Sequence, residues 1–123
     1  MTIFMAVDYV YLPALLSAPV ILFMVGIWMY KFPPKKVNYY MGYRTPRSKR
    51  SPEAWREANR YSSKLLVEFS LILIAVTLWL WFLKDPTDEY AAQMAFIDTF
   101  LLLLFMVLLI IMTERHLKKM FEN

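Results

Sequence analysis

Residues 10–29 read VYLPALLSAPVILFMVGIWM, a run of 20 residues without a charged side chain. An α-helix rises about 1.5 Å per residue, so this run covers about 30 Å, the thickness of a bilayer's hydrocarbon core. We predict a transmembrane helix here, with a kink at Pro19 because proline removes a backbone hydrogen bond. The whole chain has 123 residues, of which 59% are hydrophobic, too many for a soluble domain of this size to bury.

Two further apolar runs predict two more transmembrane helices. The second covers residues 65–83 and contains one acid, Glu68; the third covers residues 91–112 and contains Asp98. The uncharged part of the third run, residues 99–112, would cover only about 21 Å as a helix, which is too short to span. Asp98 must therefore lie within the membrane region. The expected architecture is a single all-α membrane domain over residues 1–123.

The charged residues predict how the chain is oriented in the membrane. The loop of residues 31–64 carries ten Lys and Arg residues against two acids. Basic loops mark the cytoplasmic side, so we expect the N-terminus outside, this loop inside and the C-terminus inside. A basic segment next to a membrane also attracts anionic lipid headgroups. We expect this loop to contact lipid rather than nucleic acid.

The basic loop contains signals for its own folding. Pro33 and Pro34 end the first helix, and glycine and proline mark residues 42–48 as an irregular segment. Ser51 then supplies an N-cap and Pro52 the first position of a new helix, which can continue into the second span. This segment is amphipathic, and its small face comprises Trp55, Ala58, Asn59 and Ser62.

Two stretches of this loop carry a family resemblance. They read GYRTPRS at residues 42–48 and SPEAWREANRYSSK at residues 51–64, which leads directly into the second span. The sequence resembles the SdpI family of bacterial membrane proteins, named for immunity to a secreted peptide toxin. The matching residues are Gly42, Tyr43, Arg44, Thr45, Ser48, Trp55 and Asn59.

The resemblance implies protection of the cell against a membrane-active toxin, and in some members sequestration of a cytoplasmic repressor. It implies a location in the bacterial plasma membrane, a peptide toxin as a partner outside the cell, and a regulator as a partner inside. Longer family members have additional spans before this unit. We take the matching residues, together with Arg60, as candidate binding residues.

The two intramembrane acids are the other candidate functional residues, because ionisable groups within spans are costly. We expect Glu68 to hold the 42–48 segment against the second helix, through Lys64 or a loop arginine. For Asp98 two interpretations stay open: a wet outer vestibule that senses an external ligand, or a helix contact with Gln93 or Thr99.

Residue content limits the chemistry that is available. The chain has no cysteine and one histidine, and no set of nucleophile, base and orienting group is recognisable. We therefore expect no enzyme activity, no catalytic residues, no cofactor and no metal site. Two alternatives to an immunity protein stay open, a small proton-coupled exporter and a membrane enzyme acting on lipid or peptide, and assembly into a homo-oligomer is compatible with each of them.

Overall fold

The computed structural model describes residues 2–85 and 87–122, with side chains from residue 10 onward. The described chain forms three long helices: α1 (Thr2–Lys31), α2 (Pro52–Trp81) and α3 (Asp88–Phe121). All three are long and apolar enough to cross a membrane. The predicted all-α architecture with three spans is thus confirmed.

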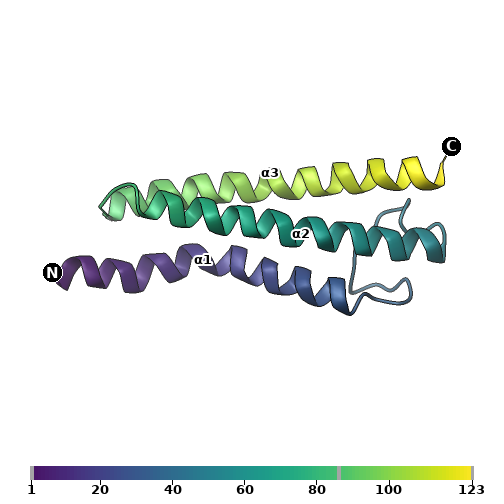
Figure 1. The fold of residues 1–123 in the computed structure, drawn as a ribbon, viewed down its shortest axis with the longest axis horizontal. Coiled ribbons are helices and arrows are strands. Elements are labelled where there is room, and N and C mark those ends of the chain that lie inside the picture. Colours follow the sequence, from purple (N-terminus) through teal and green to yellow (C-terminus); the bar gives the residue numbers. More distant parts are fainter. Residues whose placement is uncertain (1, 86, 123) are drawn as a thin grey trace.

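The helices lie side by side, with α2 in the middle (Figure 1). Helix α2 packs against both neighbours, whereas α1 and α3 share only a small contact. Gly26 of α1 allows a close approach to α2, because a Cβ atom there would lie 2.9 Å from Cγ2 of Val67. The ribbon of α1 bends along its length (Figure 1). Two prolines, Pro13 and Pro19, lie inside this helix, and proline is a usual cause of such bends.

Helix α2 combines the predicted amphipathic segment and the second span in one continuous helix of 30 residues. It begins where the sequence predicts, because the Ser51 side chain accepts a hydrogen bond from the backbone N–H of Ala54 at 3.0 Å. It ends at Trp81, two residues before the predicted end of the span. All four residues of the predicted face, Trp55, Ala58, Asn59 and Ser62, are buried.

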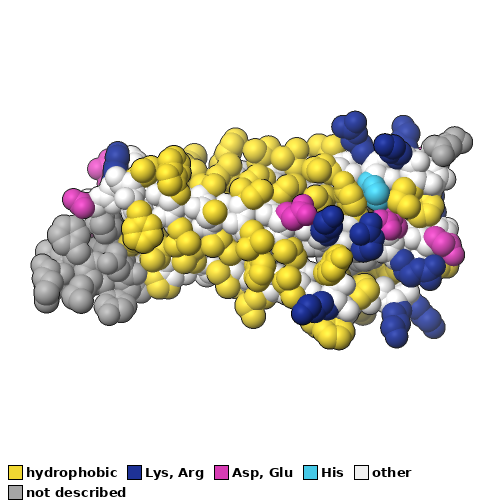
Figure 2. All heavy atoms as spheres, viewed as in Figure 1, with side chains coloured by type: hydrophobic (Ala, Val, Ile, Leu, Met, Phe, Trp, Pro, Cys, Tyr) yellow, Lys and Arg dark blue, Asp and Glu magenta, His cyan; other side chains and the backbone are white. Residues whose placement is uncertain are grey.

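The side chains form bands along the molecule (Figure 2). Hydrophobic side chains cover the middle, and most basic side chains gather at the end that carries the loop between α1 and α2. The large exposed hydrophobic side chains include Met24 on α1, Trp79 on α2 and Phe100 on α3. An apolar surface of this kind is suited to lipid rather than water.

Candidate functional site

Residues 42–48 fold into a compact structure against α2 and α3, which we call the loop cap. It comprises residues 42–48 together with Trp55 and Asn59 of α2 and Glu114 of α3. Gly42 lies close against α2 and has a φ of +98°. A Cβ atom at this position would lie 2.5 Å from Oδ1 of Asn59 and 3.2 Å from Cζ2 of Trp55. Only glycine fits here, both by conformation and by space.

Asn59 and Trp55 hold the backbone of the loop. Oδ1 of Asn59 accepts a hydrogen bond from the backbone N–H of Tyr43 at 2.7 Å, while its Nδ2 donates to the carbonyl of Trp55 at 2.8 Å. The indole N–H of Trp55 donates to the carbonyl of Pro34 at 2.8 Å. Both side chains are almost completely buried. Their polar atoms are thus used to fasten two separate points of the loop to α2.

A turn between Thr45 and Ser48 closes the loop cap. The Ser48 hydroxyl oxygen accepts the backbone N–H of Thr45 at 2.8 Å, and the Thr45 hydroxyl oxygen accepts the backbone N–H of Ser48 at 3.2 Å. The Ser48 hydroxyl also lies 3.1 Å from the carbonyl of Tyr43, and Ser48 is fully buried. These reciprocal bonds fix the turn locally, as serine and threonine side chains commonly do.

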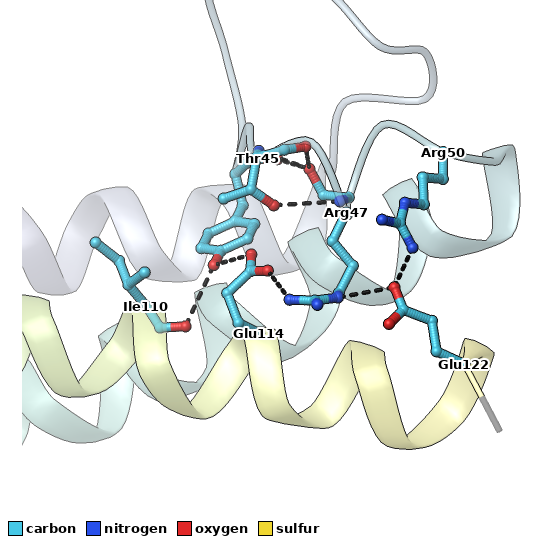
Figure 3. Close-up of polar contacts among 8 residues, drawn as sticks. Thr45, Arg47, Arg50, Ile110, Glu114 and Glu122 are labelled. Atoms are coloured by element: carbon cyan, nitrogen blue, oxygen red, sulfur yellow. Dashed lines mark hydrogen bonds and ion pairs between the residues drawn. The ribbon is translucent and has the colours of Figure 1, made fainter.

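Glu114 connects the 42–48 segment to α3. Its Oε1 accepts a hydrogen bond from the Tyr43 hydroxyl at 2.7 Å, and its Oε2 pairs with the Arg47 guanidinium at 2.7 Å. Figure 3 shows Arg47 reaching from the loop toward both Glu114 and Glu122, which stand on the last turns of α3 and at its end. Arg47 and Glu122 are 2.9 Å apart, and Arg50 pairs with the same Glu122 oxygen.

These contacts set the electrostatics of the loop cap. Burial, and then the hydrogen bond to Glu114, raise the pKa of the Tyr43 hydroxyl, so that it stays a donor. The carboxylates of Glu122 and Glu114 raise the pKa of Arg47, and Arg47 in turn lowers the pKa of Glu122. The loop and the end of α3 are therefore joined as charged partners at neutral pH.

The structure brings six of the predicted residues together in the loop cap: Gly42, Tyr43, Thr45, Ser48, Trp55 and Asn59. The other two do not pack among these six: Arg44 lies within the 42–48 segment but its side chain is exposed, and Arg60 lies outside the loop cap. Arg44 is exposed, donates to the carbonyl of Tyr39 at 3.2 Å and lies over the Tyr39 ring. Arg60 is exposed and pairs with Glu57 one turn earlier on α2.

The prediction for Glu68 is wrong. Its side chain is exposed on α2, and it forms no hydrogen bond or ion pair with any described residue. Glu114 of α3 fastens the 42–48 segment instead. The physical reason is direction: the loop lies over the face of α2 that carries Trp55 and Asn59, and Glu68 does not share that face.

Sequence reasoning also missed a second junction between α2 and α3. The ring of His116 stacks on Tyr61, with centroids 4.0 Å apart, and its Nε2 lies 3.0 Å from Oε1 of Glu57. Together with Glu114, this contact places two polar junctions at the loop end of α3.

Asp98 lies far from the loop cap. It is 16 residues before Glu114, which is about 24 Å along α3. The side chain is buried, and its Oδ2 lies 3.0 Å from the Thr77 hydroxyl of α2. The predicted helix contact therefore exists, but with Thr77 rather than Gln93 or Thr99.

Comparison with known proteins assigns this chain to a family. Residues 35–113, which include the loop cap up to the residue before Glu114, match the SdpI/YfhL protein family. The chain belongs to the SdpI family. One SdpI-type relative is the "Uncharacterized protein YfhL" of Bacillus subtilis (strain 168), which is 32% identical over 100 residues, covering 81% of this chain and 82% of that protein. No solved structure matches the chain. The match to the SdpI/YfhL family covers every residue of the loop cap except Glu114.

Proposed function

We propose that this SdpI-family membrane protein protects a bacterial cell against a membrane-active peptide toxin and that it does so as a binding protein rather than an enzyme. The observation that carries this proposal is the hydrogen bonding of the residues that match the SdpI family. Trp55, Asn59 and Ser48 are buried and spend their polar atoms on the chain's own backbone. Such residues build a rigid connection; a catalytic centre would instead direct polar groups toward a substrate.

The loop cap offers a route by which toxin binding outside the cell changes the structure of the loop on the cytoplasmic side. In the proposed orientation the basic loop faces the cytoplasm, since it holds ten basic residues and two acids. Glu114 stands on α3 and is bonded to Tyr43 and Arg47 of the loop. A toxin that shifts α3 along or around its axis would pull on these bonds and move the loop cap.

Through the exposed basic side chains of the loop, this movement changes what the loop can bind on the cytoplasmic side. Arg44 in the loop cap and Lys36 and Lys49 next to it are exposed. These side chains can bind anionic lipid headgroups or an acidic face of a cytoplasmic regulator. Releasing the loop cap would change which of these cations are presented together. Recruitment of a regulator then follows from the same movement that accompanies toxin binding.

The proposal is tested by producing the chain in a sensitive bacterium. The cells are challenged separately with synthetic membrane-active peptides, cationic or uncharged, and with the dye ethidium. Protection from a peptide without resistance to ethidium supports the proposal. Ethidium resistance that disappears when the proton gradient is removed indicates an exporter instead. If neither effect appears at a verified membrane level of the protein, the immunity role is wrong.

A further inference from the structure

A pocket of about 150 Å³ lies among the three helices beside the second proline of α1. Asp98 lines it from α3, and Pro19 lines it from α1. Both residues are buried. Among the described residues lining this pocket, Asp98 is the one ionisable group. The neighbours from each helix are Ala14, Ala18 and Leu15 of α1, Leu73 of α2, and Ala95 and Thr99 of α3.

The pocket lies at the depth of the hydrocarbon core. Asp98 stands ten residues after the start of α3 at Asp88, which is about 15 Å along the helix. Its neighbours Phe96, Ile97 and Phe100 are exposed on the outside of α3, where lipid would surround them. An ionised carboxylate at this depth needs a positive charge or several donors to offset its lost hydration.

The hydrogen bonds around Asp98 supply too few donors. The Thr77 hydroxyl lies 2.8 Å from the carbonyl oxygen of Leu73 and 3.0 Å from Oδ2 of Asp98. A hydroxyl has one hydrogen, so it cannot donate to both. The second carboxyl oxygen, Oδ1, is buried and accepts no hydrogen bond from any residue that the structure describes.

A proton on Asp98 completes this arrangement. Protonated Oδ2 donates to the Thr77 hydroxyl, and Thr77 donates to the Leu73 carbonyl, so that each hydrogen has one acceptor. The proton also removes the charge, which leaves a neutral group in a mostly apolar pocket. A metal cation would need several oxygen ligands, whereas the described lining is dominated by alanine, leucine and proline.

We propose that Asp98 is a proton-binding site within the membrane and that its proton keeps α1 packed against α3. On release, the O–H bond of the carboxyl breaks, the proton passes to water at the mouth of the pocket, and the carboxylate stays behind and draws water in. Since α1 and α3 share only a small contact, hydration of the pocket separates these two helices. This site is independent of the toxin-immunity proposal, because none of the residues of the loop cap takes part in it.

Infrared spectroscopy of the full chain in lipid vesicles tests the protonation. Buffers of neutral pH are used, with NaCl or choline chloride at equal ionic strength. The wild type should show the carbonyl band of a protonated carboxyl, Asp98→Asn should lose it, and Thr77→Val should shift it. Glu68→Gln is the matched control for an exposed acid on a membrane helix and should keep the band. A band absent from the wild type, or one that NaCl removes, overturns the proposal.

Spin labels test the movement of α1. The native chain has no cysteine, so Val10→Cys on α1 and Phe96→Cys on α3 can be labelled specifically, and both wild-type side chains are exposed. The distance between the labels should grow as the pH is raised in the wild-type background and stay constant in the Asp98→Asn background. Equal growth in both backgrounds, or no growth in either, would show that Asp98 does not control this packing.

Discussion

Replacing Gly42 with alanine should open the loop cap while leaving the three helices in place. Gly42 has a φ of +98°, a conformation that residues with a side chain rarely adopt. The added methyl group would lie 2.5 Å from Oδ1 of Asn59. Because Asn59 is buried and packed beside Trp55, its amide must move away from the backbone N–H of Tyr43.

The size of the effect follows from two separate costs. Holding a residue with a side chain in a sparsely populated backbone region costs about 1 to 3 kcal/mol. Losing the hydrogen bond between Asn59 and the Tyr43 N–H leaves a partly buried donor without a partner, which costs about 1 to 3 kcal/mol more. A total of at least about 2 kcal/mol lowers the ratio of closed to open loop caps by about 30-fold or more.

Hydrogen exchange in lipid nanodiscs measures this ratio at the Tyr43 amide. Gly42→Ala should reduce the protection of that amide by at least about 30-fold, with amides in the middle of α2 unchanged. The matched control is Tyr40→Ala, which removes a side chain that is 93% exposed and should leave protection as it is. Equal protection in Gly42→Ala and wild type would refute the account of how the loop packs on Asn59.

Three further predictions concern the contacts between the loop and α3. Glu114→Gln removes the ion pair with Arg47 but keeps an acceptor for the Tyr43 hydroxyl. Thermal denaturation should show a free energy of unfolding that is lower by about 1 kcal/mol. The control Glu68→Gln should leave the free energy of unfolding unchanged. Tyr43→Phe deletes the hydroxyl that Glu114 accepts and should cost about 1 kcal/mol, seen as faster exchange across residues 43–48; unchanged exchange would contradict it. Arg47 lowers the pKa of Glu122 below its usual 4.5, so the contact contributes stability above that pH and loses it as the pH falls through the lowered value. An NMR titration of the last turn of α3 should therefore show loosening on acidification, and loosening near neutral pH would contradict the prediction.

Most of the fold follows from residue patterns that act over short distances. An uncharged run of 20 residues predicts a span because length and composition are sufficient. Ser51 followed by Pro52 predicts the start of α2 because capping involves only neighbouring atoms. The face of Trp55 and Asn59 follows from the period of the helix. In each case, the deciding interaction lies within a few residues of sequence.

The fastening of the loop to α3 could not be predicted in this way. Tyr43 and Glu114 are 71 residues apart, and no pattern in the sequence pairs them. Glu114 stands among charges just beyond an apolar run, where it resembles a solvated helix end. Glu68 was the more conspicuous acid because it lies inside a span, yet it is exposed on α2. Conspicuous placement in the sequence does not tell which way a side chain points.

Survival under toxin challenge tests most directly whether the loop cap is what protection depends on. Cells that produce wild type, Gly42→Ala or Tyr40→Ala at equal membrane levels are exposed to a peptide from which the wild type protects. The account predicts that Gly42→Ala loses protection and that Tyr40→Ala keeps it. Full protection by Gly42→Ala, in protein whose Tyr43 amide exchanges rapidly, would contradict the account.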